Sequence, residues 1–197
     1  MSEGRGLRQS RTRFQQRALS KLCGGSLRDN SPAVADELVA RLKSVVRLAL
    51  IVAMCLGVGI MGSLVTRPEI PTWYADIIKP SWTPPSLVFP IAWTALYILM
   101  AISLWRLWKN EPRSAARSSA IVWFLAQLVL NAAWSAIFFS WHGTKTALVI
   151  IVALLLAIGV TIIFASRVDR VAAYLLVPYL AWVAYATTIN AGVVALN

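Results

Sequence analysis

The sequence predicts an all-α membrane protein: a five-transmembrane-helix bundle with a long loop, rich in proline and tryptophan, between helices 1 and 2. Of the 197 residues, 58% are hydrophobic and 14% charged, whereas a soluble domain is about half apolar and a quarter charged. A membrane-spanning helix needs about 20 apolar residues. Five uncharged runs meet or approach this length, at 48–66, 86–105, 118–141, 146–166 and 171–197.

These runs divide the chain into two parts. Residues 1–44 form a basic N-terminal extension that we expect to be disordered, and residues 45–197 form one transmembrane domain. The extension nevertheless ends in a helix-start signal, because Ser31-Pro32 precedes Asp36 and Glu37. We expect membrane helices at about 45–66, 86–108, 118–141, 145–166 and 171–195.

The basic residues of the extension have two interpretations. Residues 1–28 hold seven Arg and Lys against one acid, Glu3. This composition is typical of an organelle transit peptide, and equally of a disordered cytosolic tail that lies on anionic lipid. An organelle membrane is therefore expected, the mitochondrial membrane first and the ER or Golgi membrane as the alternative. The excess of basic residues on one side of the spans places the N-terminus in the cytosol.

The net charge of +11 does not indicate nucleic acid as a partner. Ten of the 19 basic residues lie in residues 1–47, and the others separate apolar runs. A basic face interleaved with stacking aromatics is absent from the sequence. Cys23 and Cys55 are not paired in any metal-binding spacing, so we expect no metal site. The membrane runs hold no acid–base pair or nucleophile, which favours a protein that is not an enzyme.

The segment before the second run predicts a lid. Lys79-Pro80 and Thr83-Pro84-Pro85 cannot continue a helix, because proline lacks the N–H and restrains the residue before it. The same segment carries two tryptophans, which a solvated loop seldom contains. The residues expected to form the lid are Trp73, Lys79, Pro80, Pro84 and Pro85.

Three helix faces combine aromatic rings with polar groups. Residues three or four apart share a face, and polar groups within a membrane point towards protein or a cavity. We therefore expect the faces to meet. The amides alone favour simple interhelical hydrogen bonds, whereas the rings suit a flat apolar ligand. The faces are Phe89/Trp93/Tyr97, Gln127/Asn131/Trp134/Phe138 and Tyr179/Trp182/Ala186/Asn190.

Small residues suggest close helix approach. Gly57, Gly59 and Gly62 predict that the first membrane helix packs tightly inside the bundle. Ala132 and Ala136 on the third run would allow a homodimer.

With these motifs in view, the chain resembles the translocator protein family, also called the tryptophan-rich sensory proteins or TspO/MBR family. The N-terminal extension is similar to that of plant-type members. Besides the Phe89/Trp93/Tyr97 face, the motifs that carry the resemblance are Trp73-Tyr74, KPSWTPP at 79–85, QLVLNAAWSAIFF at 127–139 and PYLAWVAYATTIN at 178–190.

The resemblance implies a pocket under the first loop that binds tetrapyrroles such as haem and protoporphyrin, and sterols or other lipids in some members. No resident cofactor is implied. The leading function is that of a porphyrin receptor or scavenger in a stress response. A porphyrin or sterol transporter is one alternative, and light-dependent porphyrin breakdown at Trp82 and Trp182 is another. The ligand-binding residues, with Tyr97 added from its face, would be Trp82, Trp93, Tyr97, Asn131, Trp134, Trp182 and Ala186.

Departures from the animal members shift the expected ligand. Thr146 stands where they carry an aromatic residue, and Asn190 is followed by neither the Tyr nor the Arg of their sterol motif. Tetrapyrrole is therefore favoured over cholesterol. His142, the single histidine, is expected to lie at the end of the bundle away from the loop and not to ligate haem.

Overall fold

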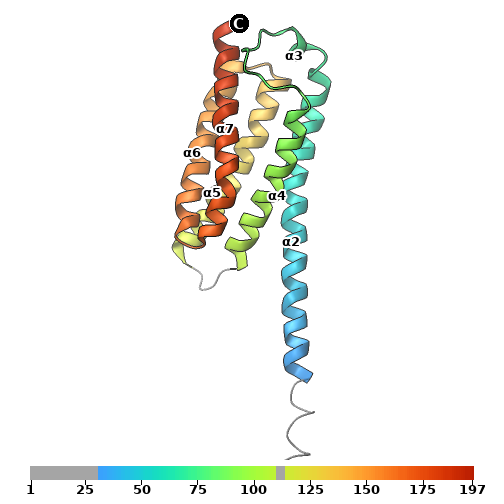
Figure 1. Ribbon diagram of the computed structural model, residues 1–197, viewed down its shortest axis with the longest axis vertical. Coiled ribbons are helices and arrows are strands. Elements are labelled where there is room, and N and C mark those ends of the chain that lie inside the picture. Colours follow the sequence, from blue (N-terminus) through green and yellow to red (C-terminus); the bar gives the residue numbers. More distant parts are fainter. Residues whose placement is uncertain (1–30, 110–113) are drawn as a thin grey trace, which may run out of the picture. The chain divides into compact units, whose positions relative to one another are not determined.

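The computed structural model of the protein describes residues 31–109 and 114–197, and every regular element in these ranges is helical (Figure 1). Five of the described helices are long and apolar enough to cross a membrane, so the predicted fold class is confirmed. The basic stretch 1–28 lies outside the described residues. The elements are α2 (Ser31–Thr66), η1 (Arg67–Glu69), α3 (Trp73–Asp76), α4 (Val88–Lys109), α5 (Ala115–Ser135), η2 (Ala136–Ser140), α6 (Thr144–Ser166) and α7 (Arg170–Leu196).

Local sequence signals explain where these helices begin. Ser114 accepts a hydrogen bond from the backbone N–H of Arg117 at 3.2 Å, and Asp169 accepts from those of Val171 and Ala172, so both residues are N-caps. Helix α2 begins at Ser31, where the Ser-Pro signal predicts a start. Residues 31–44, assigned from sequence to the disordered extension, are therefore helical.

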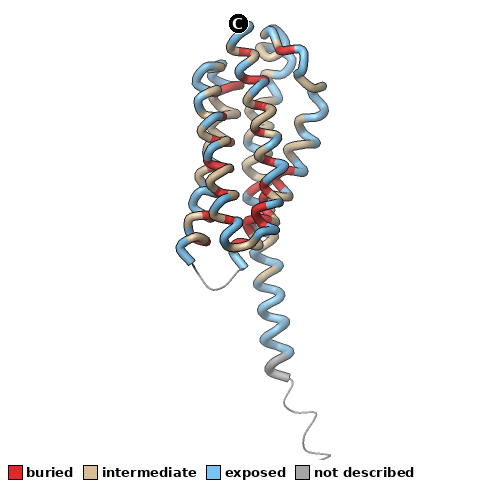
Figure 2. Tube along the Cα trace, turned by 60° about the vertical axis from the view of Figure 1, so that its left-hand side comes forward, coloured by how far each residue is buried: buried red, intermediate tan, exposed pale blue. Residues whose placement is uncertain are grey.

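The chain divides into two compact units, residues 1–45 and residues 46–197. In the first unit, the side chains described, from Val34 onwards, are mostly exposed, and Arg41 pairs with Glu37 at 2.7 Å. In the second unit, α5 packs on α6, α6 on α7, and α4 on both α7 and α5. Buried residues lie along the inner sides of these helices (Figure 2). The largest fully buried side chains include Met100, Phe124, Ile158 and Tyr179.

Only one face of α2 packs within the second unit, which corrects the prediction of a helix tightly packed inside the bundle. Ile51 and Cys55 are buried, and a Cβ added at Gly59 would lie 2.6 Å from the Tyr97 ring. The opposite face exposes large apolar side chains, which suits a helix in contact with lipid. These are Leu50, Ile60, Met61 and Leu64.

Polar contacts join the helices at the end away from the 67–87 loop. Arg117 donates to the carbonyl oxygens of Leu107 and Trp108 at 2.9 and 2.6 Å, and Arg106 pairs with Asp169 at 2.8 Å. Partial burial alone would raise the pKa of Asp169. The hydrogen bond from Arg106 and those from the backbone N–H groups outweigh it, so the pKa lies below its ordinary value.

Candidate functional site

A chain of hydrogen bonds joins three helices in the interior. The Tyr97 hydroxyl on α4 donates to Asn131 Oδ1 on α5 at 2.9 Å, and Asn131 Nδ2 donates to the Tyr179 hydroxyl on α7 at 3.1 Å. All three side chains are buried. The helical spacing predicted that these faces would meet, and the contacts confirm it. The amide of Asn131 therefore serves as an interhelical hydrogen-bond partner, as the simpler interpretation of the amides expects.

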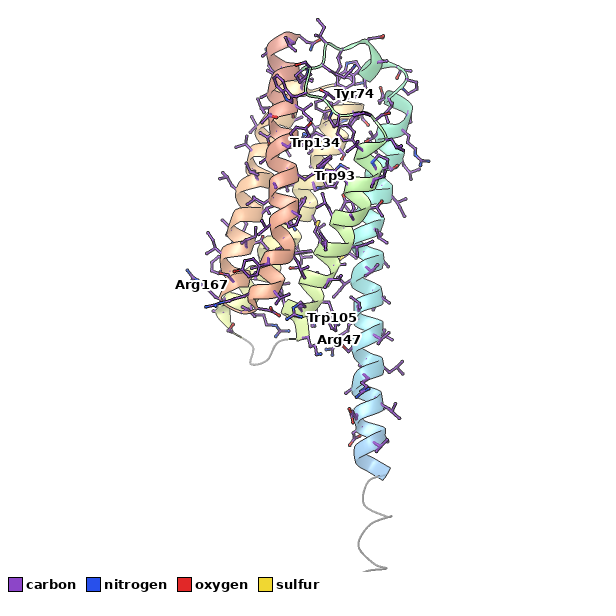
Figure 3. The ribbon with its side chains drawn as sticks, in the orientation of Figure 1. Arg47, Tyr74, Trp93, Trp105, Trp134 and Arg167 are labelled. Atoms are coloured by element: carbon purple, nitrogen blue, oxygen red, sulfur yellow. The ribbon has the colours of Figure 1, made fainter. Side chains whose placement is uncertain are left out.

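Trp93 lies on this polar chain, one turn nearer the loop. Its ring stacks on Tyr97 with centroids 5.6 Å apart and meets Tyr179 edge-on at 6.2 Å. Figure 3 shows Trp93 and Trp134 in the half of the helices nearest the loop, with Trp105 near the opposite end. Two of the predicted ligand-binding rings therefore lie in the same half of the bundle.

Trp134 belongs to a second group of contacts. Its indole N–H donates to Asn190 Oδ1 on α7 at 3.1 Å, and Asn190 Nδ2 donates to the carbonyl of Thr144 on α6 at 3.0 Å. The ring stacks on Phe138 at 5.3 Å. Phe138 lies in the π-helical turn η2, which continues α5. π-Helical turns occur often at functional sites.

Trp182 differs from the other half-buried tryptophans, Trp93 and Trp134, in one respect. Its ring meets Phe89 edge-on at 5.9 Å and lies 5.9 Å from Tyr185. Its indole Nε1 is buried but has no hydrogen-bond partner among the described residues. Ala186, one turn along the same face, is buried with 8% exposure. A buried donor without a partner costs about 1–3 kcal/mol, so this N–H is a candidate group for a ligand.

The loop residue Trp82 lies beside α7. Its carbonyl oxygen accepts a hydrogen bond from the Tyr185 hydroxyl at 2.6 Å, while its side chain is 53% exposed. Trp82 is thus anchored through its backbone, with much of its indole free at the surface. Tyr185 was missed in the sequence analysis, although its spacing of three residues from Trp182 places it on a neighbouring part of the same face.

The lid predicted from proline content is fixed against the C-terminal end of α7. Pro80 is buried, and a Cβ added at Gly192 would lie 2.8 Å from its ring. Asn197 forms two hydrogen bonds with the backbone of Ile78, at 3.0 and 2.9 Å. Pro84 is half-buried, and Pro85 is exposed just before α4. Sequence reasoning missed both Gly192 and Asn197, because nothing in their spacing relates them to a loop more than a hundred residues away.

The ammonium group of Lys79 makes its contacts within the loop. It donates to the carbonyl oxygens of Tyr74, Ala75 and Ile77 at 2.6, 3.3 and 3.0 Å, and lies 4.8 Å from the centre of the Tyr74 ring. These carbonyls end the short helix α3, where a cation is favourable. Burial raises the pKa of Tyr74, so its hydroxyl stays neutral.

The expectation that His142 lies away from the loop is wrong. Its ring stacks on Trp73 with centroids 4.3 Å apart and an interplanar angle of 13°, and its Nε2 lies 3.0 Å from Glu69 Oε2. Helices α2 and α5 both end on the loop side, so the residue after α5 reaches the loop. His142 has a φ of 52°, a conformation that is uncommon for a residue other than glycine.

The described contacts assemble the predicted site residues into linked groups of rings and amides in the loop-side half of the bundle. Comparison with known proteins decides the family, because the sequence matches the TspO/MBR family over residues 51–196. The chain belongs to the TspO/MBR family. The matched region contains the loop and every predicted site residue, so the resemblance inferred from the motifs is confirmed.

Individual relatives of this TspO/MBR chain cover most of its length. The tryptophan-rich protein TspO of Chlorobaculum tepidum is 38% identical over 155 residues, 79% of this chain and 98% of that protein. The TspO of Archaeoglobus fulgidus is 36% identical over 154 residues, covering 78% and 99%. The human translocator protein is 36% identical over 131 residues, covering 66% and 78%. The chain is thus a multi-pass membrane protein of the translocator and tryptophan-rich sensory protein family.

Proposed function

We propose that this protein binds a tetrapyrrole, haem or protoporphyrin, against the aromatic faces of α4, α5 and α7. The observation that carries the proposal is the buried indole N–H of Trp182, which has no partner among the described residues. It lies in a set of rings that already includes Phe89 and Tyr185. A flat apolar ligand with a few hydrogen-bond acceptors would satisfy both features, because it stacks on rings and accepts from the N–H.

The role of each side chain follows from its contacts. Trp93 is already oriented by stacking on Tyr97, and Trp134 by stacking on Phe138 and by its hydrogen bond to Asn190, so both offer rigid surfaces at small entropic cost. The indole N–H of Trp182 would donate to an acceptor on the ligand. Ala186 leaves room beside that ring, and Trp82 would cover the ligand from the loop.

Binding in this manner needs no metal ligand from the protein. Among the described residues no group of three or more His, Cys, Asp or Glu side chains could hold a metal ion, and His142 is engaged with Glu69 and Trp73. Lys79 donates to three loop carbonyls, so its proposed part is to hold the loop rather than to pair with porphyrin carboxylates. A receptor or scavenger acting in stress fits this arrangement, with an organelle membrane as its proposed site.

The test is a titration of the purified protein with protoporphyrin in the dark, read by quenching of tryptophan fluorescence. Saturable quenching that an excess of sterol does not reverse supports the proposal. Quenching reversed by equimolar sterol would make lipid the ligand, and an absence of quenching would exclude the tetrapyrrole. Repeating the measurement under light separates binding from breakdown, since only breakdown changes the porphyrin spectrum with time.

A further inference from the structure

Thr83, in the loop before α4, carries a buried hydroxyl. Its Oγ1 is shielded from solvent and has no hydrogen-bond partner within residues 31–109 and 114–197, the part of the chain that the structure describes. Such a hydroxyl is costly, because it has lost its bonds to water and gained none in exchange. Several other threonines avoid this cost by donating to a backbone carbonyl of their own helix. They are Thr66, Thr94, Thr161, Thr187 and Thr188.

The backbone around Thr83 holds this hydroxyl in place. The N–H of Thr83 donates to the carbonyl oxygen of Pro80 at 3.0 Å, and Pro84 restricts the residue before it to an extended conformation. Threonine is branched at Cβ, which limits the rotation of its side chain. The hydroxyl is therefore preorganised, so that a ligand bound to it orders little that was free before.

Thr83 lies where the loop passes beside the C-terminal half of α7 (Figure 1). Just before it in sequence, the carbonyl oxygen of Trp82 accepts a hydrogen bond from the Tyr185 hydroxyl at 2.6 Å. Six residues after it, Phe89 meets the Trp182 ring edge-on at 5.9 Å. The rings of Trp182 and Tyr185 are themselves 5.9 Å apart. The segment that contains Thr83 is thus held on both sides against one patch of α7.

The same patch contains Trp182 Nε1, which is also buried and has no partner in the described part of the chain. An indole nitrogen can only donate a hydrogen bond, and a threonine hydroxyl can donate one as well. A carbonyl oxygen has two lone pairs and can accept from both groups. Two donors that bind nothing else therefore suit a ligand that carries a carbonyl group at its edge.

The surroundings favour a neutral carbonyl group over an ionised carboxylate. A buried charge is costly unless an opposite charge pairs with it. Lys79 is the cation of this loop, and its ammonium group already donates to three backbone carbonyls. Hydrogen-bond acceptance rather than negative charge is then the property that the patch can recognise.

We propose that Thr83 and Trp182 form the polar end of the ligand site and donate together to one carbonyl oxygen at the edge of the ligand. This inference rests on the proposed binding of a tetrapyrrole, and it adds Thr83 as a residue that determines specificity. Neither donor gives up another bond when the ligand arrives, so the site discriminates against flat molecules that lack the oxygen.

Three planar porphyrins test the proposal with the full chain in detergent, in the dark, through quenching of tryptophan fluorescence. Protoporphyrin carries carboxyl groups, its dimethyl ester keeps the carbonyls without the charge, and octaethylporphyrin has no oxygen. We expect the ester to bind at least as tightly as the acid. Octaethylporphyrin should bind about 25-fold more weakly than the ester, because each lost hydrogen bond weakens binding about fivefold.

Substitutions at position 83 assign the effect to its hydroxyl. Thr83→Val keeps the branched shape and should weaken binding of protoporphyrin and its ester about fivefold, with no change for octaethylporphyrin. Thr83→Ser should restore the wild-type constants. Thr94→Val is the matched control, because the exposed Thr94 hydroxyl is already bonded to the carbonyl of Pro90 at 2.7 Å, and it should leave all three constants unchanged.

The outcomes separate this proposal from tetrapyrrole binding itself. Equal binding of the three porphyrins by the wild type, or a Thr83→Val change that weakens all three alike or none, would overturn the role of Thr83 and leave tetrapyrrole binding standing. An ester that binds much more weakly than the acid would show that charge is recognised, which also contradicts the proposal. Failure of every porphyrin to bind would exclude the proposed function, and the role of Thr83 with it.

Discussion

At the scale of single residues, the interior depends on a few amides that satisfy several partners at once. Asn131 accepts from Tyr97 and donates to Tyr179, and Asn190 joins Trp134 to Thr144. Gln127 differs, because both polar atoms of its buried amide lack a partner among the described residues. Spacing alone placed all three on inward faces, but it did not distinguish the two that hold helices together from the third.

Replacement of Asn131 by leucine should therefore destabilise the protein. Two tyrosine hydroxyls would be left buried without their partner, at a cost of about 1–2 kcal/mol in free energy of unfolding. The cost is measured by denaturant unfolding in detergent. Adding Tyr97→Phe and Tyr179→Phe to the same chain should recover part of the loss, because no hydroxyl is then orphaned. A triple variant that is less stable still would refute this account of the network.

At the scale of elements, the lid and the helices have different origins in the sequence. The helices follow from hydropathy and from caps such as Ser114 and Asp169, so they were predicted to within a few residues at most ends. The start of α2 at Ser31 was indicated only by its Ser-Pro signal. The anchors of the lid, by contrast, are long-range contacts, such as that between Asn197 and Ile78, and no local pattern predicts them.

Glycine substitutions test the lid. Gly192→Ala would place a Cβ 2.8 Å from Pro80, so the loop must shift, and we expect faster proteolysis of the 67–87 segment. Gly159→Ala on α6 is the matched control, because nothing lies within 4 Å of its added Cβ. Equal rates of proteolysis for the two variants would mean that a Cβ at position 192 does not displace Pro80.

A second pair of glycine substitutions tests the packing of α2. An added Cβ at Gly59 meets the Tyr97 ring at 2.6 Å, whereas one at Gly57 meets nothing within 4 Å. Gly59→Ala should lower the thermal midpoint by several degrees, and Gly57→Ala should raise it slightly through its better helix propensity. If both substitutions raise the midpoint, α2 does not pack on Tyr97.

At the scale of the whole molecule, the two ends of the bundle serve different purposes. At the end away from the loop, Arg106 forms an ion pair with Asp169, and Arg117 donates hydrogen bonds to two backbone carbonyls. The loop end gathers aromatic rings and the indole donor of Trp182, which has no partner in the part of the chain that the structure describes. The family resemblance implied a ligand pocket at the loop end, which stays a prediction, whereas the contacts of Arg106 and Arg117 at the other end were not predicted. The prediction for His142 was wrong. His142 follows the end of the third membrane helix, which lies on the same side as the loop after the first, so its ring stacks on Trp73.

The ion pair of Arg106 and Asp169 gives a pH dependence with a defined sign. Because the pKa of Asp169 is lower in the folded protein than its ordinary value, its contribution to stability is present above that ordinary value. It is lost as the pH falls through the folded pKa. Asp169→Asn keeps an N-cap oxygen but removes the charge, and should cost less than about 1 kcal/mol at neutral pH. The stabilities of the two proteins should converge as the pH falls through the lowered pKa of Asp169, and a constant difference at all pH values would contradict the assignment.

The central claim is that the aromatic groups around Trp182 bind a planar tetrapyrrole. It is tested most directly by the dissociation constant for protoporphyrin, measured in the dark for the wild type, Trp182→Phe and Trp123→Phe. Trp123 is 40% exposed on α5 and serves as the control for losing one indole. We predict that Trp182→Phe weakens binding about fivefold, the equivalent of one hydrogen bond of about 1 kcal/mol, while Trp123→Phe leaves it unchanged. Equal dissociation constants for all three proteins would contradict the claim.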